Sequence, residues 1–334
     1  MPQTCPTFRA DVRQHGLFPY FCKVPPCGLG FIIARQLLAT GHKVNLLTSF
    51  EDLIPNLTKN GINPVLGRIE NATPQRQLAK ADAVIDAELP FTFPLKRVHV
   101  ARLRPSLLRT ALEGSGRPLI VTSSAAILGD TGPVPLAENA PLHPLPGYAW
   151  LPRLEKEVLK SSGVRGMVIR PAWEVHGSRA PNWAIGIGNW MKLAKRFRRG
   201  KYIGSGENCY SAVHFDDLAD LYCVALMKAV AGTILHAASE NFSMKELAAA
   251  INRGLGFKGE PSSLSLKEAR RFSPIADNLT RSHALSGDLA RTLGWKPSRD
   301  SIMKEVEHDA FVNAFVSRAV RCHEPSAKRS EPGC

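Results

Sequence analysis

The chain has 334 residues, of which 44% are hydrophobic and 22% are charged, and its formal net charge is +14. This length is enough for one large domain or two interleaved domains with a substantial core. No apolar run reaches the roughly 18 residues needed to cross a bilayer, and the first residues lack the basic and then apolar layout of a signal peptide. The sequence therefore predicts a soluble, cytoplasmic protein with no membrane partner.

The excess of basic residues is densest between residues 192 and 201. Basic side chains are favoured at the C-terminal end of a helix by the helix dipole, and Gly200 is placed to end such a helix. The block lacks the interleaved aromatic platform of many nucleic-acid-binding proteins. We therefore expect no nucleic-acid partner, and interpret the basic surface as an attraction for an anionic cofactor or substrate.

The seven cysteines are scattered and odd in number, and they form neither CxxC pairs nor sets spaced with histidine. His143 and the other histidines likewise show no ligand spacing. This pattern indicates reduced thiols and no metal site.

Short apolar runs alternate with amphipathic stretches from residue 21 to residue 177, which is typical of βα units and of a parallel sheet. The predicted elements are, in chain order, a strand at 21–26, a helix at 31–40 closed by Gly41, strands at 43–48 and 81–87, a helix at 105–113, a strand at 118–124, a helix at 147–162 and a strand at 166–171. The regular recurrence of strands between helices predicts an α/β fold with one doubly wound parallel sheet.

The periodicity loosens after residue 178. The elements expected there are a helix at 182–199, a strand from Tyr210 that leads into a helix ending at Ala229, a strand at 232–238, and a helix that runs to Gly254 from a capping box of Ser243 and Glu246. This mixed region suits a smaller C-terminal substrate lobe at 178–320, with 210–238 returning to the first domain at 21–177. Residues 1–20 are expected to form a loose extension and residues 321–334 a disordered tail.

A glycine motif stands immediately before the first predicted helix. Gly28 and Gly30 fit the first two positions of the G-x-G-x-x-G pattern, in which a dinucleotide pyrophosphate rests on free backbone N–H groups. Ile33 takes the third position, where glycine allows close packing, so we expect it to push the helix outward. Pro25 and Pro26 remove hydrogen-bond donors from the predicted first, central strand. A glycine turn before an ordinary helix is the alternative interpretation.

Six short segments are weak motifs singly but specific as an ordered set. They are Gly30-Phe-Ile, Gly41-His-Lys-Val, and the stretches 121–129, 169–177, 211–219 and 293–297. Over roughly residues 25 to 300, the chain thereby resembles the extended or atypical short-chain dehydrogenase/reductases, the NAD-dependent epimerase/dehydratase family. The resemblance implies a Rossmann-type fold, a nicotinamide lying against the strand that ends in Ser124 and near Pro171, and a homodimer as the default assembly.

The resemblance also implies NAD or NADP as the cofactor. An acidic residue at the end of the second strand normally indicates NAD, and a basic residue there indicates NADP. The segment from Thr48 to Glu51 matches neither pattern cleanly, so the choice between the two cofactors stays open. The residues expected to hold the cofactor are Gly28, Gly30, Phe31, Ile32, Thr48, Ser49, Ala87, Ser123 and Pro171.

By the same resemblance, Ser124 hydrogen-bonds the reacting oxygen and Tyr148 is the acid/base. Each also fits a simpler interpretation, Ser124 as a strand-end hydroxyl that caps a turn and Tyr148 as a packed aromatic. A tyrosine has an unperturbed pKa near ~10 and needs a nearby cation to favour its phenolate. The lysine that would supply this cation four residues on is replaced by Pro152, and Arg153 points about 100° away around a helix.

Two histidines and a tryptophan complete the candidate site. His176 and His214 lie where the family builds its substrate mouth, and either is a candidate acid/base because histidine titrates near neutrality. We assign His176 to catalysis, and His214 together with Trp173 to substrate binding. A hydrogen-bonded structural histidine is the alternative for both.

These features leave three functions open. The leading prediction is an NAD(P)-dependent oxidoreductase, epimerase or dehydratase that acts on a small hydroxylated or carbonyl substrate and has a degenerate tyrosine-lysine signature. The first alternative is a non-redox isomerase, lyase or cyclase that reuses the pocket. The second is a catalytically silent dinucleotide-binding regulator.

Overall fold

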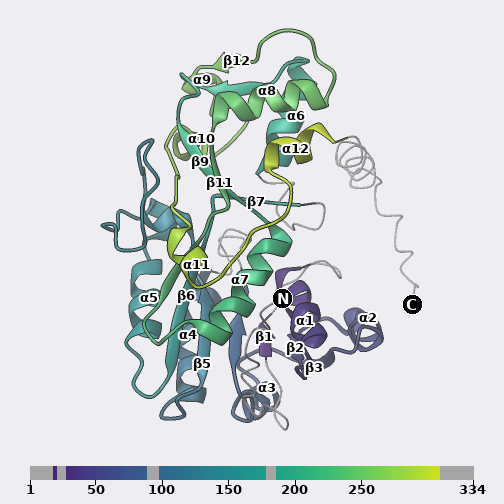
Figure 1. Cartoon of the computed structure of the whole chain (residues 1–334), viewed down its shortest axis with the longest axis vertical. Helices are drawn as coiled ribbons and strands as arrows, with labels where there is room; N and C mark the ends of the chain where they lie inside the picture. The colour runs from purple at the N-terminus through teal and green to yellow at the C-terminus, as the bar shows by residue number, and fades with distance from the viewer. Residues whose placement is uncertain (1–17, 21–27, 89–97, 178–185, 309–334) are drawn as a thin grey trace, which may run out of the picture.

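The computed structural model describes residues 18–20, 28–88, 98–177 and 186–308 (Figure 1). Its centre is a seven-stranded sheet in which every pairing is parallel and the strand order is β10-β6-β5-β4-β1-β2-β3. The strands are β1 (Phe18–Tyr20), β2 (Asn45–Thr48), β3 (Asn63–Leu66), β4 (Val84–Asp86), β5 (Pro118–Thr122), β6 (Arg165–Pro171) and β10 (Ile234–Ala237). The order reverses between β1 and β4, which is the doubly wound Rossmann arrangement and confirms the predicted fold class.

Helices cover the sheet in two layers, because parallel strands need crossover connections that place a helix on a face. One layer contains α1, which contacts β1, β2 and α7. The other contains α4, which contacts α3, α5 and β5. The helices are α1 (Leu29–Ala39), α2 (Ile54–Lys59), α3 (Ala72–Leu78), α4 (Val98–Leu112), α5 (Leu151–Leu159) and α7 (Phe215–Lys228).

A smaller lobe is built from the C-terminal part and lies at the top of Figure 1. Its three-stranded sheet has the order β11-β9-β7, and a two-stranded sheet pairs β12 with β8. These strands are β7 (Glu174–His176), β8 (Lys201–Ile203), β9 (Cys209–His214), β11 (Glu240–Ser243) and β12 (Ser262–Leu264). The lobe helices are α6 (Ile187–Phe197), α8 (Met244–Gly254), α9 (Leu266–Ala269), α10 (Ala276–Leu279) and α12 (Ile302–Glu307), whereas α11 (Asp288–Thr292) contacts β10 of the main sheet. The chain returns to the main sheet through α7 and β10, and the predicted capping box of α8 is present.

The central strand lies earlier in the chain than predicted. β1 comprises Phe18–Tyr20 and pairs with β2 and β4, whereas the sequence predicts this strand at 21–26 and a loose extension before it. β1 itself contains Pro19, which lies opposite Ile85 of β4, so a proline does not by itself exclude a residue from the central strand. Residues 21–27, with both prolines, lie outside the described residues.

Helix α6 also ends earlier than predicted. Its last residue is Phe197, and Arg198 adopts φ 49° and ψ 36°, the left-handed conformation that ends many helices. Gly200, the predicted stop, instead lies against α8, where a Cβ atom would come within 2.1 Å of the carbonyl oxygen of Ala248. This glycine therefore permits a close approach of two elements and does not cap the helix.

The predicted disordered tail at 321–334 lies outside the described residues. Within the described ranges, no helix combines the length and the apolar character needed to cross a membrane.

A buried ion pair connects the main sheet to α5. Arg170 in β6 donates from Nε and Nη2 to the two carboxylate oxygens of Glu155, at 2.9 and 2.7 Å, and the two side chains are 1% and 3% exposed. Nη1 of Arg170 also donates to the carbonyl oxygen of Glu138 and lies 3.2 Å from Nε2 of His236 in β10. Burial and the adjacent guanidinium lower the pKa of His236 to about 3, so its imidazole is neutral and accepts this hydrogen bond. One arginine thereby joins β6, α5, β10 and a loop.

Removing the carboxylate of this pair is expected to be costly, because the guanidinium stays buried without a partner. We expect Glu155→Ala to lower the free energy of unfolding by about 3–5 kcal/mol. Glu157→Ala on the same helix breaks only the pair with Arg153, whose side chain is 86% exposed, and is expected to cost less than about 1 kcal/mol. Urea unfolding followed by circular dichroism measures both variants, and equal losses would contradict the role assigned to the buried pair.

Candidate active site

The N-terminus of α1 lies at the edge of the sheet where the sequence predicts the cofactor. Gly28 is the N-cap of α1 and, like Gly30, is buried. No side chain caps this helix, and the Gly28 carbonyl oxygen accepts from the amides of Phe31 and Ile32. In the described part of the chain, the preceding amides of the first turn have no hydrogen-bond partner. The positive end of the helix dipole is thus available to an anionic group.

The third position of the glycine motif is filled without separating α1 from the sheet. Ile33 has no exposed surface, and α1 contacts both β1 and β2. The expectation that this branched side chain pushes the helix outward is therefore wrong, because the core accommodates it.

Other predicted cofactor residues lie at the carboxyl ends of three strands. Thr48 ends β2 and is buried, with its Oγ1 accepting from the amide of Phe50 at 3.1 Å, whereas the following Ser49 is exposed. Ala87 directly follows β4, and Pro171 ends β6, and both are buried. Because the strands are parallel, these ends share one edge of the sheet, which is where open α/β sheets bind ligands.

Ser123 has an unsatisfied polar group at the same edge. It follows β5, its amide donates to the carbonyl oxygen of Ile169 at 2.8 Å, and the residue has no exposed surface. Its hydroxyl oxygen is buried and has no hydrogen-bond partner among the described residues. A buried hydroxyl without a partner is costly, so a polar group of a ligand is the natural partner for it.

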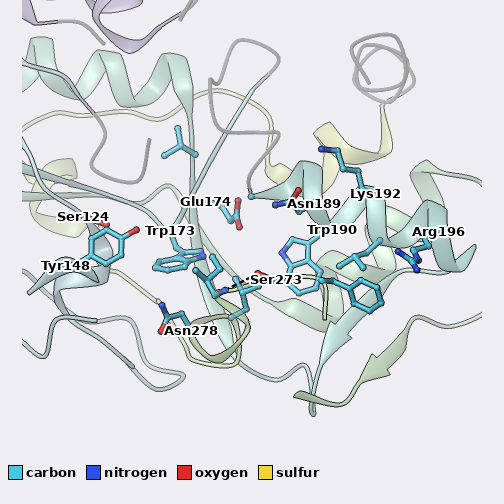
Figure 2. A pocket seen from close by; sticks show the side chains of 16 residues that line it. Ser124, Tyr148, Trp173, Glu174, Asn189, Trp190, Lys192, Arg196, Ser273 and Asn278 are labelled. Atoms are coloured by element: carbon cyan, nitrogen blue, oxygen red, sulfur yellow. Dashed lines mark hydrogen bonds between the residues drawn. The ribbon is translucent and has the colours of Figure 1, made fainter. Parts of the chain in front are cut away.

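A cavity of about 450 Å³ begins beside Ser124 and extends into the smaller lobe (Figure 2). Three predicted site residues, Ser124, Tyr148 and Trp173, line it together. Figure 2 shows Ser124 and Tyr148 at one end of the cavity, and Lys192 and Arg196 at the other. The remaining lining residues include Glu174, Gly186, Asn189, Trp190 and Phe272.

Ser124 both caps a turn and presents a proton to the cavity. It precedes the short 3₁₀ helix η4 (Ala125–Ile127), and its Oγ accepts from the amide of Ala126 at 3.2 Å. A hydroxyl that accepts in this way still has its O–H group to donate. The capping role that the sequence left as an alternative is therefore real, and it leaves the hydroxyl free to donate to a ligand.

Tyr148 lies in a 3₁₀ turn and not in the helix predicted to carry it. The turn η5 spans Pro146–Tyr148, and α5 begins at Leu151 instead of at residue 147. Pro152 is consequently in the first turn of α5, where its missing N–H is not needed. Burial raises the pKa of Tyr148, and no cation of the described ranges offsets that effect. Its phenol therefore stays protonated at neutral pH.

Trp173 forms a rigid wall of the cavity. Its indole stacks on the ring of His283, with centroids 3.8 Å apart and an angle of 8° between the planes. It also meets Tyr210 edge to face at 6.1 Å. Burial lowers the pKa of His283 to about 4, so the stacked imidazole is neutral at physiological pH.

The two candidate histidines lie together outside the cavity lining. His176 is buried, and its Nδ1 lies 2.5 Å from Glu305 in α12 and its Nε2 3.8 Å from Glu240 in β11. His214 is the N-cap of α7, and its Nδ1 accepts from the amide of Asp216 at 3.1 Å. The structure therefore does not bring His176 and His214 together with Ser124, Tyr148 and Trp173 in the cavity lining, and the roles assigned to the two histidines stay predictions.

Glu174 is the cavity residue that sequence reasoning missed. It opens β7, pairs with Ala212 of β9, and is 4% exposed. Its carboxyl group accepts from the amide of Ile187, the first residue of α6. Burial raises the pKa of Glu174 to about 8, so the group is largely neutral at pH 7. The only local signal is one acid between the apolar residues Trp173 and Val175, which does not distinguish a cavity acid from a surface one.

Two members of the basic block reach the outer end of the cavity. Lys192 and Arg196 are one turn apart on α6 and are both exposed. The guanidinium of Arg196 lies 4.9 Å from the ring centroid of Phe272. The block is thus a solvated helix end that also contributes positive charge to the cavity mouth. In the described ranges, no cluster of three or more histidine, cysteine or acidic side chains is arranged to hold a metal ion.

Comparisons with known proteins place this architecture in context. The chain is 32% identical over 291 residues to the uncharacterized protein C2A9.02 of Schizosaccharomyces pombe, a match that covers 85% of this chain and 96% of that protein. Among solved structures, dTDP-glucose 4,6-dehydratase DesIV of Streptomyces venezuelae, with NAD bound, has a TM-score of 0.68 at 18% identity and 89% and 96% coverage. UDP-glucose 4-epimerase of Thermotoga maritima has a TM-score of 0.67 at 17% identity and 91% and 99% coverage. No family model matches the chain.

The parallel sheet, the inserted lobe and the cavity between them define the fold of the extended short-chain dehydrogenase/reductases, as the sequence predicted. The two solved structures are less than 25% identical in sequence to this chain, so their similarity establishes the fold alone. The chain itself belongs to the same family as the uncharacterized protein C2A9.02 of Schizosaccharomyces pombe.

The position of the Glu174 carboxyl group depends on a glycine beside it. At Gly186, a Cβ atom would lie 2.2 Å from Oε2 and 3.0 Å from Cδ of Glu174. We expect Gly186→Ala to lower the free energy of unfolding by about 1–3 kcal/mol, because the methyl group overpacks a buried site. Gly147→Ala is the matched control, since no atom lies within 4 Å of its Cβ position. Thermal unfolding measures both, and equal melting temperatures would show that Glu174 is not held against Gly186.

Proposed function

We propose that this chain is an NAD(P)-dependent oxidoreductase, epimerase or dehydratase that acts on a small hydroxylated or carbonyl substrate. The observation that carries the proposal is the convergence of Ser124 and Tyr148 on one cavity at the carboxyl edge of a Rossmann-type sheet (Figure 2). A hydroxyl and a phenol at such a place suit the reaction of a carbonyl or alcohol oxygen.

The residues at the sheet edge fit a dinucleotide. The first amides of α1 have no partner in the part of the chain that the structure describes, and with buried Gly28 and Gly30 they suit a pyrophosphate. The hydroxyl of Ser123 offers a hydrogen bond beside β5. Phe31, Ile32, Thr48, Ser49, Ala87 and Pro171 complete the proposed cofactor site. A bound nicotinamide would supply hydride transfer, and NAD is present in the DesIV structure. Neither NAD nor NADP is favoured by the residues that follow β2.

The cavity residues can orient a reacting oxygen and protonate it. The oxygen of Ser124 is occupied by the amide of Ala126, so its O–H group is left to donate to the substrate oxygen. Tyr148, whose phenol stays protonated, donates its proton to the alkoxide that develops on a reduced carbonyl. Because burial raises its pKa and no described cation favours its phenolate, Tyr148 is rarely ionised at neutral pH and so is seldom available as a base. We therefore expect carbonyl reduction to be faster than alcohol oxidation at neutral pH.

Cofactor calorimetry followed by one substitution tests the proposal. We expect NADH or NADPH to bind, and a panel of aldehydes and ketones to reveal turnover. Tyr148→Phe is then expected to lower kcat by at least about 100-fold with the cofactor Kd unchanged, because only the proton donor is removed. Tyr202→Phe, a tyrosine of β8 outside the cavity lining, is the matched control and should leave kcat unchanged.

The same measurements separate the alternatives. If neither reduced cofactor binds, the redox proposal is abandoned in favour of a non-redox isomerase, lyase or cyclase that uses the cavity alone. If a cofactor binds but no ketone, aldehyde or alcohol turns over, a dinucleotide-binding regulator is favoured. The expected homodimer and cytoplasmic location belong to the same proposal, and analytical ultracentrifugation and cell fractionation test them.

A further inference from the structure

One side chain of the cavity lacks the partner that its burial requires. Glu174 is 4% exposed and lines the cavity, and the amide of Ile187 donates to its carboxyl group. Among the described residues, no positively charged group contributes to the stabilisation of its ionised form. A carboxylate removed from water is strongly disfavoured unless it is paired. Within the described ranges, the cavity therefore holds a buried acid that has no cationic partner.

Aromatic rings flank this acid. Figure 2 shows the carboxyl group of Glu174 between the indoles of Trp173 and Trp190, and all three side chains line the cavity. Trp173 is immobilised by its stack on His283, and Trp190 is 4% exposed. The face of an indole attracts cations more strongly than that of any other side chain, and the attraction increases when water is excluded. A buried acid with two indoles beside it is the chemical complement of an ammonium group.

We propose that Glu174, Trp173 and Trp190 form a subsite for an amino group, so that the cavity takes a hydroxylated or carbonyl substrate that also carries a primary ammonium. The position of the reacting oxygen at Ser124 and Tyr148 rests on the proposed function. The ammonium subsite itself belongs to the cavity and needs no cofactor. In this subsite, the ligand's ammonium pairs with the Glu174 carboxylate inside a cavity that the two indoles also line.

The charged groups on neighbouring elements do not pair with Glu174, so this pairing is left to a ligand. Lys192 and Arg196 of α6 are exposed at the outer end of the cavity, where solvent and salt screen them. Tyr210 of β9 is buried, and its hydroxyl donates to the carbonyl oxygen of Leu279 at 2.9 Å. Burial and then Glu174 raise the pKa of Tyr210 well above its ordinary value, so it stays neutral.

The remaining titratable neighbours are also neutral or engaged elsewhere. Tyr148 is protonated at the opposite end of the cavity, and His283, behind Trp173, is neutral at physiological pH. His176, on the same strand as Glu174, lies against Glu305 and outside the cavity lining. Among the described residues, Glu174 is thus the group of this cavity that an ammonium can pair with.

The ionisation of Glu174 gives amine binding a characteristic pH dependence. In the free protein, burial raises the pKa of this carboxyl group to about 8, so at pH 7 an incoming ammonium must displace a proton. Binding at pH 7 is therefore coupled to release of close to one proton, and affinity rises between about pH 6 and pH 8. Primary amines stay protonated over this interval. An acid that instead donated a hydrogen bond to a neutral ligand would lose affinity over the same interval.

Isothermal titration calorimetry without cofactor tests the subsite with two probes matched in size. These are 2-amino-1-phenylethanol and 1-phenyl-1,2-ethanediol. They differ at one position, where the first carries an ammonium and the second a hydroxyl. We expect the amine to bind at least about 30-fold more tightly, with proton release seen as a dependence of the heat on buffer ionisation enthalpy. Glu174→Gln keeps the acceptor for the Ile187 amide and should abolish both the preference and the proton release. Glu207→Gln, an exposed acid outside the cavity lining, should change neither.

Several outcomes would overturn the subsite. They are no amine binding, equal affinity for the two probes, an amine affinity that falls between about pH 6 and pH 8, or unchanged amine binding by a folded Glu174→Gln protein. Calorimetry with NADH and NADPH keeps this test apart from the proposed function. Amine preference without cofactor binding would retain the subsite and remove the redox proposal, whereas cofactor binding without amine preference would do the opposite.

Discussion

The buried pair between Arg170 and Glu155 is the interaction on which the candidate site depends. It joins the end of β6 to α5, and the segments next to these two elements form facing parts of the cavity. Trp173 and Glu174 follow β6, and Tyr148 lies just before α5. Because both charges are removed from water, the pair is stable in only one geometry, and that geometry sets the distance between the two sides of the site.

Burial, more than charge, determines the protonation of the groups that face the cavity. Among the described residues, no cation favours the ionised form of Tyr148, and only a backbone amide favours that of Glu174, so burial keeps both largely protonated at neutral pH. Ser124 also keeps a proton to donate, because its oxygen is already engaged by an amide. Two such donors at one end of the cavity, Ser124 and Tyr148, suit the stabilisation of negative charge on a substrate oxygen, whereas Glu174 is the acid of the proposed ammonium subsite.

The local backbone explains why proline is tolerated at position 152. The tyrosine turn η5 and helix α5 are separate elements, and Pro152 falls in the first turn of α5. Ala149 and Trp150, the residues between η5 and α5, keep right-handed helical dihedrals, so Pro152 still follows Tyr148 by about one turn. Proline fits there because it lies in the first turn of α5, but it brings no cation to the tyrosine.

The sequence by itself determined the α/β class, most helices and strands, and the meeting of Ser124, Tyr148 and Trp173, because these depend on periodicity, glycine positions and local capping such as Ser243 with Glu246. It misplaced β1 and the start of α5, because pairing partners and 3₁₀ turns are not encoded in a hydrophobic period. Only the tertiary structure decided the surroundings of His176, His214 and Glu174. His176 is engaged by Glu305, 129 positions away, and Glu174 is buried by α6. Burial and pKa arise from contacts between residues distant in the chain, so no local pattern could assign them.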